Sequence, residues 1–331
     1  MLSKICASAG VFAAARQVAS KTVMVSLPHK KANATDNLYP VTITGTGSVP
    51  CLTVGLGTLL LNTASETFFN HFKLFSSDLY WHQNNALENA NELTMESISS
   101  DVGSIATQLQ LASGYILMAH SCFGMVALEH AKQDKRVQGV VLVASPPAWN
   151  ADMWEKAKRF FENNADQGRK DNNAARVAHY ELIKKPNDSE LSMEKYISDT
   201  ARYWANYEID DDTIKSVWNN VEADDNAANR FFVDLLPEYH LENDLEKVNC
   251  PIFLAAGPFD YDCIPLELWR DHPAAKKLDN KLTIVECPNS GHWPNYEDRE
   301  IFDTQLFDWV KRHHICDYEH EDEKSKHALG V

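Results

Sequence analysis

The sequence predicts an α/β fold with a mostly parallel central sheet and an inserted all-helical cap. Short, nearly all-apolar runs recur along the chain, and helix-like segments separate them. The apolar runs then stop for about a hundred residues and resume only at Pro251. A chain of 331 residues, of which 44% are apolar, is long enough to bury a large core.

The expected strands are the short apolar runs Cys51–Val54, Tyr115–Ala119, Val140–Ala144, Ile252–Ala256 and Leu282–Val285. Continuous apolarity over four or five residues is typical of strands that helices cover on both faces. Helices are predicted over Thr94–Leu109 and Ile301–Val310. In the second helix, apolar residues recur at i, i+4, i+7 and i+8, which places them on one face.

The segment without apolar runs carries charged, helix-like sequence with aromatic residues spaced along it. We interpret it as a helical cap inserted into the α/β core. The predicted organisation is a basic N-terminal arm over 1–37, a first core part over 38–147, the cap over 148–249, a second core part over 250–314 and a charged tail over 315–331.

The first 35 residues contain no Asp or Glu and five Lys or Arg, a composition that resembles an organelle transit peptide. A secretory signal cut short by Arg16 and a simple basic arm are the alternatives. We expect a cytoplasmic protein, with a mitochondrial location as the alternative. No apolar run approaches the roughly 20 residues of a membrane span.

The overall charge and the cysteines exclude several other classes. The net charge is −16, whereas a nucleic-acid partner needs a clustered basic surface. The seven cysteines are scattered and form no CxxC pair, so we expect reduced thiols and no metal site.

A serine and a cysteine lie side by side where a predicted strand meets a predicted helix, and either could be a nucleophile. Small residues are favoured two positions before and after the nucleophile of such a turn. With Ser121 as the nucleophile, the second following residue is the bulky Phe123. With Cys122, the second preceding residue is His120, whose ring would clash. Strand length favours Ser121, because the helix then begins at Gly124.

A nucleophilic serine needs a base, and the base needs an orienting carboxylate. Asp260 follows the predicted strand Ile252–Ala256, and His292 lies in a glycine-containing loop after the last predicted strand. Open α/β sheets keep functional residues at such strand ends. The ordered trio Ser121, Asp260 and His292 therefore predicts a hydrolytic site, with Asp262 as the alternative acid.

Three segments, AHSCFGMVALEHA, AAGPFDYDCIPLELW and NSGHWPNYEDREIFDTQLFDWV, resemble the α/β-hydrolase superfamily. The resemblance is greatest to its proline iminopeptidase-like branch, in which a helical cap follows the sixth strand, and it runs from about Val41 to Arg312. It implies that Ser121 is the nucleophile, Asp260 the orienting acid and His292 the base. Epoxide hydrolase and dehalogenase relatives carry Asp at the nucleophile position, so the serine points to acyl transfer.

Two segments depart from the family pattern. The oxyanion-hole motif usually has a histidine, whereas this chain reads Val54-Gly55-Leu56-Gly57-Thr58. Backbone N–H groups form such a hole, so we expect those of Cys122 and of Gly57, or alternatively Leu56, to act. The segment Asp78–Ala86 lacks the usual Asp-x-Arg-Gly-x-Gly loop, which puts the substrate in doubt.

The resemblance implies a serine hydrolase that cleaves a small ester, amide or thioester, with a small molecule or short peptide as substrate and no metal or organic cofactor. A proline iminopeptidase-type aminopeptidase and a non-catalytic ligand-binding module are the alternatives. The predicted substrate-binding side chains are His120, Phe123, Tyr203, Trp204 and Trp293.

Overall fold

A computed structural model describes residues 19–27, 38–79, 93–184, 193–221 and 225–317. One eight-stranded sheet runs through the molecule in the order β1-β2-β4-β3-β5-β6-β7-β8. β1 and β2 are antiparallel to their neighbours, and every pairing from β4 to β8 is parallel. The strands are β1 (Ser20–Ser26), β2 (Leu38–Thr44), β3 (Val49–Val54), β4 (Phe72–Ser76), β5 (Tyr115–His120), β6 (Val137–Val143), β7 (Ile252–Ala256) and β8 (Leu282–Glu286).

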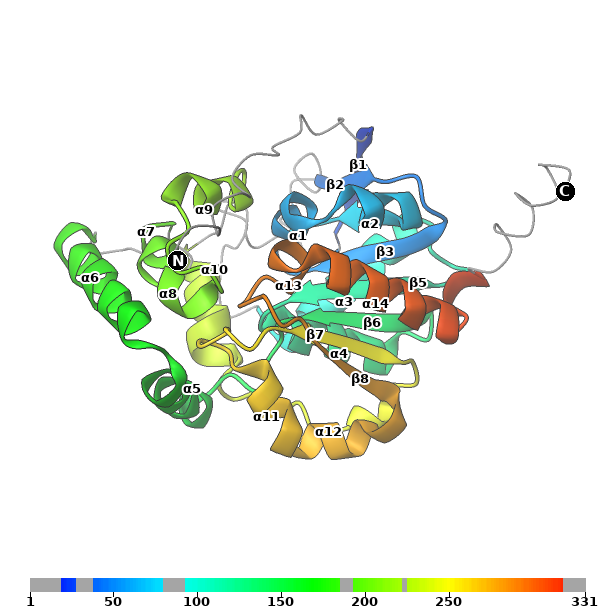
Figure 1. The fold of residues 1–331 in the computed structure, drawn as a ribbon. Coiled ribbons are helices and arrows are strands. Elements are labelled where there is room, and N and C mark those ends of the chain that lie inside the picture. Colours follow the sequence, from blue (N-terminus) through cyan, green and yellow to red (C-terminus); the bar gives the residue numbers. More distant parts are fainter. Residues whose placement is uncertain (1–18, 28–37, 80–92, 185–192, 222–224, 318–331) are drawn as a thin grey trace, which may run out of the picture.

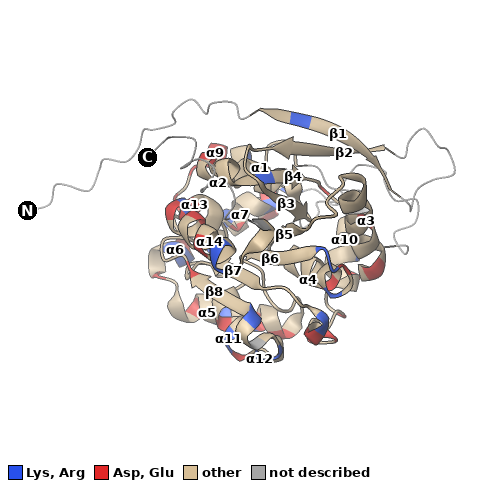
Figure 2. Cartoon of the chain, turned by 90° about the vertical axis from the view of Figure 1, so that its right-hand side faces the viewer, with Lys and Arg blue, Asp and Glu red and all other residues tan. Residues whose placement is uncertain are grey.

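The central strands are apolar throughout because their alternating side chains are buried on both faces of the sheet. From β5, Leu117 packs in the core with α3 and α4, whereas Met118 packs on the opposite side with α2 and α14. Figure 2 shows α3 and α4 on one side of the sheet and α13 and α14 on the other. The helices of these two layers are α1 (Gly57–Thr63), α2 (Glu66–His71), α3 (Met95–Gln108), α4 (Phe123–Gln133), α13 (Pro294–Glu297) and α14 (Arg299–Arg312).

The two helices expected from the sequence are present as α3 and α14. Thr94 caps α3 through a reciprocal capping box with Ser97, which explains why the helix begins at Met95. In α14 the predicted apolar face is buried, with Leu306 fully enclosed beneath β7 and β8.

The chain leaves the sheet after β6 and returns at β7, and the described residues between them form only helices and turns. These cap helices lie together beyond one end of the sheet (Figure 1). They are α5 (Ala151–Asn164), α6 (Gln167–Ile183), α7 (Met193–Ser198), α8 (Thr200–Tyr203), α9 (Asp211–Val217), α10 (Asp225–Asn229) and a π-helix over Arg230–Leu235. A 3-10 turn over Leu245–Lys247 follows them and packs against α4 in the core. The expectation of an all-helical cap agrees with the described part of the insertion.

The structure differs from the predicted boundaries at both ends. The expected arm over 1–37 includes Ser20–Ser26, which forms β1, because Val25 is buried against the core and the strand pairs with β2. The expected tail over 315–331 begins inside the core, since Ile315 is only 2% exposed. The rest of the expected arm, over 1–18 and 28–37, lies outside the described ranges, and so does the rest of the expected tail, over 318–331.

Two further helices, α11 (Pro265–Asp271) and α12 (Pro273–Leu278), follow β7.

The six cysteines within the described ranges are all free thiols. Among the described helices, none is both long enough and apolar enough to cross a membrane.

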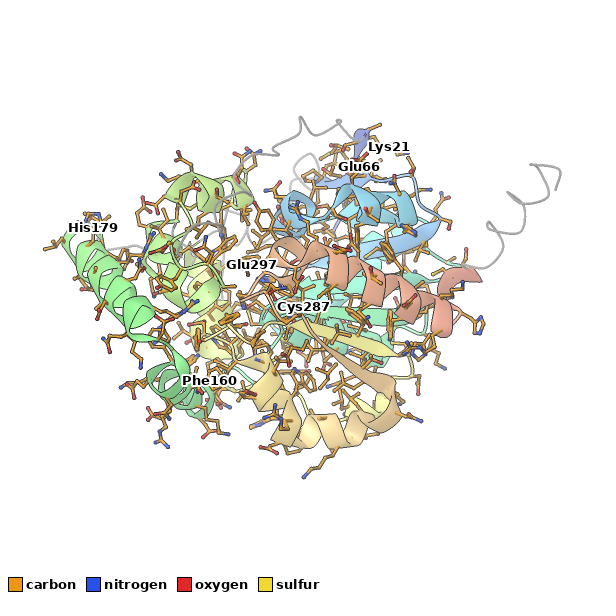
Figure 3. The ribbon with its side chains drawn as sticks, in the orientation of Figure 1. Lys21, Glu66, Phe160, His179, Cys287 and Glu297 are labelled. Carbon is orange, nitrogen blue, oxygen red and sulfur yellow. The ribbon has the colours of Figure 1, made fainter. Side chains whose placement is uncertain are left out.

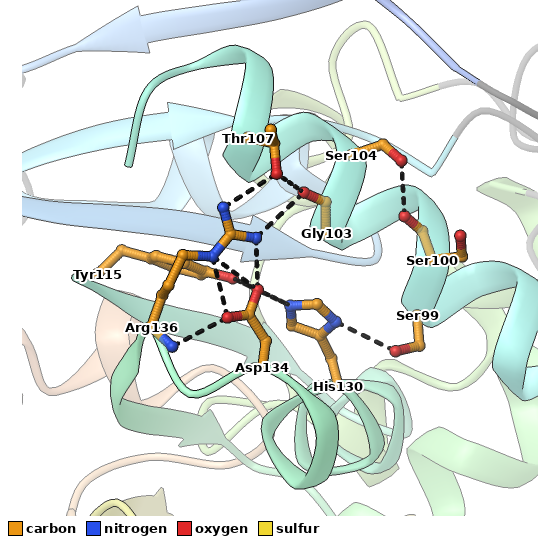
Figure 4. Close-up of polar contacts among 9 residues, drawn as sticks. All are labelled: Ser99, Ser100, Gly103, Ser104, Thr107, Tyr115, His130, Asp134 and Arg136. Carbon is orange, nitrogen blue, oxygen red and sulfur yellow. Dashed lines mark hydrogen bonds and ion pairs between the residues drawn. The ribbon is translucent and has the colours of Figure 1, made fainter. Parts of the chain in front are cut away.

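A partly buried polar cluster links α3, α4, β5 and the start of β6 (Figure 4). Asp134 accepts hydrogen bonds from the Tyr115 hydroxyl at 2.9 Å and from Arg136 at 2.6 Å. His130 lies 2.9 Å from that hydroxyl and 3.1 Å from the hydroxyl of Ser99. Burial alone would raise the pKa of Asp134, but hydrogen bonds from its neighbours outweigh it and hold the pKa well below its usual range.

We expect Asp134→Asn to lower the free energy of unfolding by about 2 kcal/mol, because hydrogen bonds to a charged, mostly buried carboxylate are weakened. A depressed carboxyl pKa stabilises the fold above the unfolded value of 3.8, and this stabilisation is lost as the pH falls further. Denaturant titrations at pH 7 and pH 3 should therefore show a smaller difference between wild type and variant at pH 3. Glu155→Gln, which alters an exposed ion pair with Arg159, should change stability by less than about 0.5 kcal/mol. If both variants lost the same free energy of unfolding, Asp134 would contribute no more to stability than an exposed ion pair, contrary to this prediction.

Candidate active site

Ser121 occupies the tip of the turn between β5 and α4 with a φ of 57°. This left-handed conformation is uncommon for a residue other than glycine and is found at functional sites. Its N–H donates to the carbonyl of Val143 on the neighbouring strand at 2.8 Å. Ser121 is partly exposed, whereas Cys122 is 2% exposed and burial raises the pKa of its thiol. Of the two candidate nucleophiles, Ser121 is therefore the one at the tip of the turn.

The bulky Phe123 fits beside this turn because a glycine on another strand end leaves room for it. A Cβ atom at Gly55, which has a φ of +98°, would lie 2.3 Å from the Phe123 ring. The ring then stacks on Phe231 of the cap, with the centroids 5.3 Å apart. Gly124 allows α4 to approach the sheet, since its Cβ would lie 2.5 Å from Ser145 Oγ. A small residue was expected at the position of Phe123; instead, the small residue is Gly55, which faces the Phe123 ring from the loop after β3.

Asp260 and His292 form a buried pair at the ends of β7 and β8, with His292 Nδ1 2.7 Å from Asp260 Oδ2. The other Asp260 oxygen accepts from the N–H groups of Asp262 at 3.2 Å and Cys263 at 2.9 Å. Burial would lower the pKa of His292, but the charge and hydrogen bond of Asp260 outweigh it, and the pKa is raised. His292 therefore donates to the carboxylate of Asp260 and not to that of Asp262, whose backbone N–H in turn donates to Asp260.

The hydroxyl of Ser121 lies 3.7 Å from Cys263 Sγ. Among the described residues, it makes no hydrogen bond with His292 in this side-chain conformation. Catalytic hydrogen bonds are often loose without substrate and tighten when it binds. Cys263 was absent from the sequence prediction, and only its position three residues after Asp260 could have indicated it. Within the described ranges, Asp260, Cys263 and His292 bring possible metal-ligating atoms within 4.8 Å of one another.

His120, at the end of β5, contacts the loop that carries His292. Its Nε2–H donates to the carbonyl of His292 at 2.8 Å, and its ring stacks on Trp293 at 4.1 Å. Burial lowers the pKa of His120 and keeps the ring neutral. Trp293 and Trp204, both predicted to contact substrate, are 1% and 2% exposed and pack in the core instead. Aromatic side chains of this size are needed to fill the space beneath the cap.

A small cavity of about 50 Å³ lies over Ser121 and under the cap. Apolar and aromatic side chains make up most of its wall, which is formed by Leu56, Leu59, His120, Ser121, Cys122, Phe123, Trp149, Tyr196, Tyr203 and Phe232. The structure thus brings the predicted residues His120, Phe123 and Tyr203 to the cavity. Trp149, Tyr196 and Phe232 were not predicted, because spacing within the cap does not show which aromatic side chains face the core. Leu59 of α1 was not predicted either, because the sequence shows no signal that sets it apart from other buried leucines.

The expected oxyanion donors lie in two loops, Leu56 and Gly57 after β3 and Cys122 after β5. Leu56 lines the cavity and precedes α1, and no backbone carbonyl in the described part of the chain accepts from its N–H or from that of Cys122. Gly57 is not part of the cavity wall, and it packs closely on Thr53, since a Cβ there would lie 2.3 Å from Thr53 Oγ1. Of the two alternatives, Leu56 is the residue beside the cavity. Asp78 accepts from the N–H of Thr58 at 2.8 Å and so holds this loop, whereas 80–86 lie outside the described ranges.

No protein-family model matches the chain. The AB hydrolase superfamily protein YclE of Bacillus subtilis (strain 168) is 24% identical over 224 residues, which cover 67% of this chain and 76% of that protein. Among solved structures, a proline iminopeptidase from Mycobacterium smegmatis has a TM-score of 0.64 at 16% identity and covers 88% of this chain and 98% of its own.

A thermophilic esterase from Thermogutta terrifontis has a TM-score of 0.59 at 18% identity and covers 89% of this chain and 99% of its own. An esterase from Exiguobacterium antarcticum is similar at a TM-score of 0.58 and 16% identity, covering 87% of this chain and 98% of its own. These likenesses confirm the resemblance read from the sequence: the chain has the α/β-hydrolase fold, with a helical cap inserted after the sixth strand.

Proposed function

We propose that this protein is a serine hydrolase that cleaves a small ester, amide or thioester through an acyl-enzyme intermediate. The observation that carries the proposal is the left-handed turn at Ser121 beside the buried Asp260–His292 pair. The named functions of the esterase and proline iminopeptidase neighbours support the same reaction class.

In the proposed reaction, His292 Nε2 takes the proton of Ser121 Oγ as that oxygen attacks the substrate carbonyl. The N–H groups of Cys122 and Leu56 stabilise the oxyanion, each contributing about 3 kcal/mol. His292 then gives the proton to the leaving group, and an ester bond to Ser121 forms as the scissile bond breaks. Water, deprotonated by His292, releases the acyl group and restores the serine. Asp260 stabilises the imidazolium throughout.

An aminopeptidase is the second candidate, because carboxylates lie close to the cavity. Asp262 and Asp199 each raise the pKa of Tyr203, a residue of the cavity wall, after burial as the larger cause. Within the described part of the chain, the Asp262 side chain accepts one hydrogen bond, from Cys263 Sγ at 3.9 Å. A partly exposed carboxylate so placed suits a substrate ammonium group.

A fluorophosphonate probe tests the nucleophile directly. Wild type should form a covalent adduct on Ser121, and Ser121→Ala should lose labelling and ester turnover by on the order of 10⁴-fold or more. Cys122→Ala is the matched control and should keep both, because its thiol is buried in the protonated form. Peptide mass spectrometry locates the adduct. A folded wild type without an adduct would favour a ligand-binding module, and loss of turnover in Cys122→Ala alone would identify the cysteine as nucleophile.

The raised pKa of His292 predicts the pH dependence of the reaction. The base must be neutral to accept the serine proton, so the rate falls as the pH drops through the pKa of His292, which lies above 6.5. We expect ester turnover to decrease by about tenfold per pH unit below that midpoint. Steady-state kinetics between pH 5 and 9 would show it. A rate that is constant down to pH 5 would exclude His292 as the base.

The small cavity predicts a preference for short acyl groups. A series of p-nitrophenyl esters should be cleaved fastest at acetyl or propionyl, because about 50 Å³ of space excludes longer chains. Phe232→Ala removes a ring from the wall and should move the optimum to longer chains. Phe160→Ala, on the cap but outside the cavity wall, should leave the optimum unchanged. Cleavage of proline or alanine anilides above that of all esters would favour the aminopeptidase.

A further inference from the structure

Glu297, the last residue of α13, places its carboxylate between the cap and the loop that carries His292 (Figure 3). Its Oε1 accepts from the N–H of Ala205 at 2.7 Å. Its Oε2 accepts from the N–H groups of Gly291 at 2.8 Å and Trp293 at 3.3 Å. No ion pair within the described ranges includes Glu297, so the partners of this carboxylate are backbone donors.

The two N–H groups bound by Oε2 flank His292 on either side. The N–H of His292 itself donates to the carbonyl of Tyr203 at 2.6 Å, and its carbonyl accepts from His120 at 2.8 Å. The backbone of His292 is thus held from both sides and at both of its own polar groups. The fixed backbone sets the place from which the imidazole reaches Asp260, and the hydrogen bond from Nδ1 to Asp260 then holds the ring in one orientation.

The Tyr203–Ala205 segment of the cap is held against the same loop. A Cβ at Gly291 would lie 2.1 Å from the Tyr203 carbonyl oxygen, so only glycine permits this approach. Arg169 of α6 fixes the segment from the cap side by donating to the carbonyls of Trp204 at 2.7 Å and Ala205 at 2.6 Å. Glu297 is the side chain that joins this cap segment to the histidine loop.

We infer that Glu297 is a positioning residue that fastens the cap to the loop of the catalytic base and so sets the orientation of His292. The inference rests on the proposed role of His292. A carboxylate suits this place because its two oxygens can accept all three N–H groups, whereas an amide of the same shape has one oxygen and turns an NH₂ group towards N–H donors.

Because Glu297 is charged, it affects the pKa of His292, and a purely structural role would leave that pKa unchanged. Burial lowers the pKa of His292, Asp260 raises it by more, and the charges of Asp262 and Glu297 raise it further. Burial raises the pKa of Glu297 itself to about 7, against the backbone donors, which lower it. The charged groups that act on this site are Asp260 and Asp262 after β7, His292 in the loop and Arg169 of α6.

The test compares fluorophosphonate labelling of Ser121 between pH 5 and 9 in wild type, Glu297→Gln and Glu297→Asp. Glu297→Gln should label roughly tenfold more slowly or worse, since small displacements of a base are costly, and its midpoint should move to lower pH. Glu297→Asp keeps the charge but is too short to reach all the donors, so labelling slows while the midpoint stays close to that of wild type. Asp303→Asn, a buried carboxyl on α14 bonded to Ser65, is the matched control and should behave as wild type.

Thermal unfolding of each variant separates loss of fold from loss of orientation. If Glu297→Gln does not fold, Glu297→Asp decides, and labelling at the wild-type rate by a folded Glu297→Asp would overturn the inference. A folded Glu297→Gln with the wild-type rate and midpoint would also overturn it. If wild type is not labelled at all, the proposed function fails instead. NMR titration of the His292 imidazole then remains, and an unchanged pKa in Glu297→Gln would refute the coupling.

Discussion

The buried hydrogen bond between Asp260 and His292 is the constraint on which the loops at the carboxyl ends of β7 and β8 depend. A charge that is removed from water must be paired and hydrogen-bonded, or the fold loses several kcal/mol. Asp260 meets this requirement with two backbone N–H groups and the imidazole. The imidazole in turn needs a rigid loop, which His120 and Glu297 provide from opposite sides. Polar groups that look scattered in the sequence therefore serve one pair.

Close packing at the nucleophile turn shows how one local rule can be met from elsewhere in the chain. The turn brings β5 and α4 so close that small residues are favoured beside Ser121. Phe123 breaks this preference, and Gly55 on the loop after β3 restores the space. Because Phe123 is bulky, its ring also reaches the cap and stacks on Phe231. Substitutions at Gly55 and Phe123 should therefore be strongly coupled.

The inner parallel strands and the order of Ser121, Asp260 and His292 could be read from the sequence, because strands covered on both faces are continuously apolar and functional loops follow them. β1, β2 and β4 lie towards one edge of the sheet, where partial exposure mixes polar residues into the run, and no strand was predicted there. Cys263 and Glu297 went unnoticed for a different reason. Their roles depend on contacts across 142 and 92 residues of chain, which no local pattern encodes. The same limit applies to Trp204 and Trp293, whose burial is decided by how the cap sits on the core.

The attachment of the cap at one side has a consequence for how a substrate reaches Ser121. The Tyr203–Ala205 segment is hydrogen-bonded to the core, so moving it away would leave the N–H groups of Ala205 and His292 without acceptors. Across the cavity, Trp149 and Phe232 meet through ring contacts 5.9 Å apart, which can slide without leaving a polar group unpaired. Any opening of the cap that admits a molecule to Ser121 is therefore expected between these two rings and not at the Tyr203–Ala205 segment.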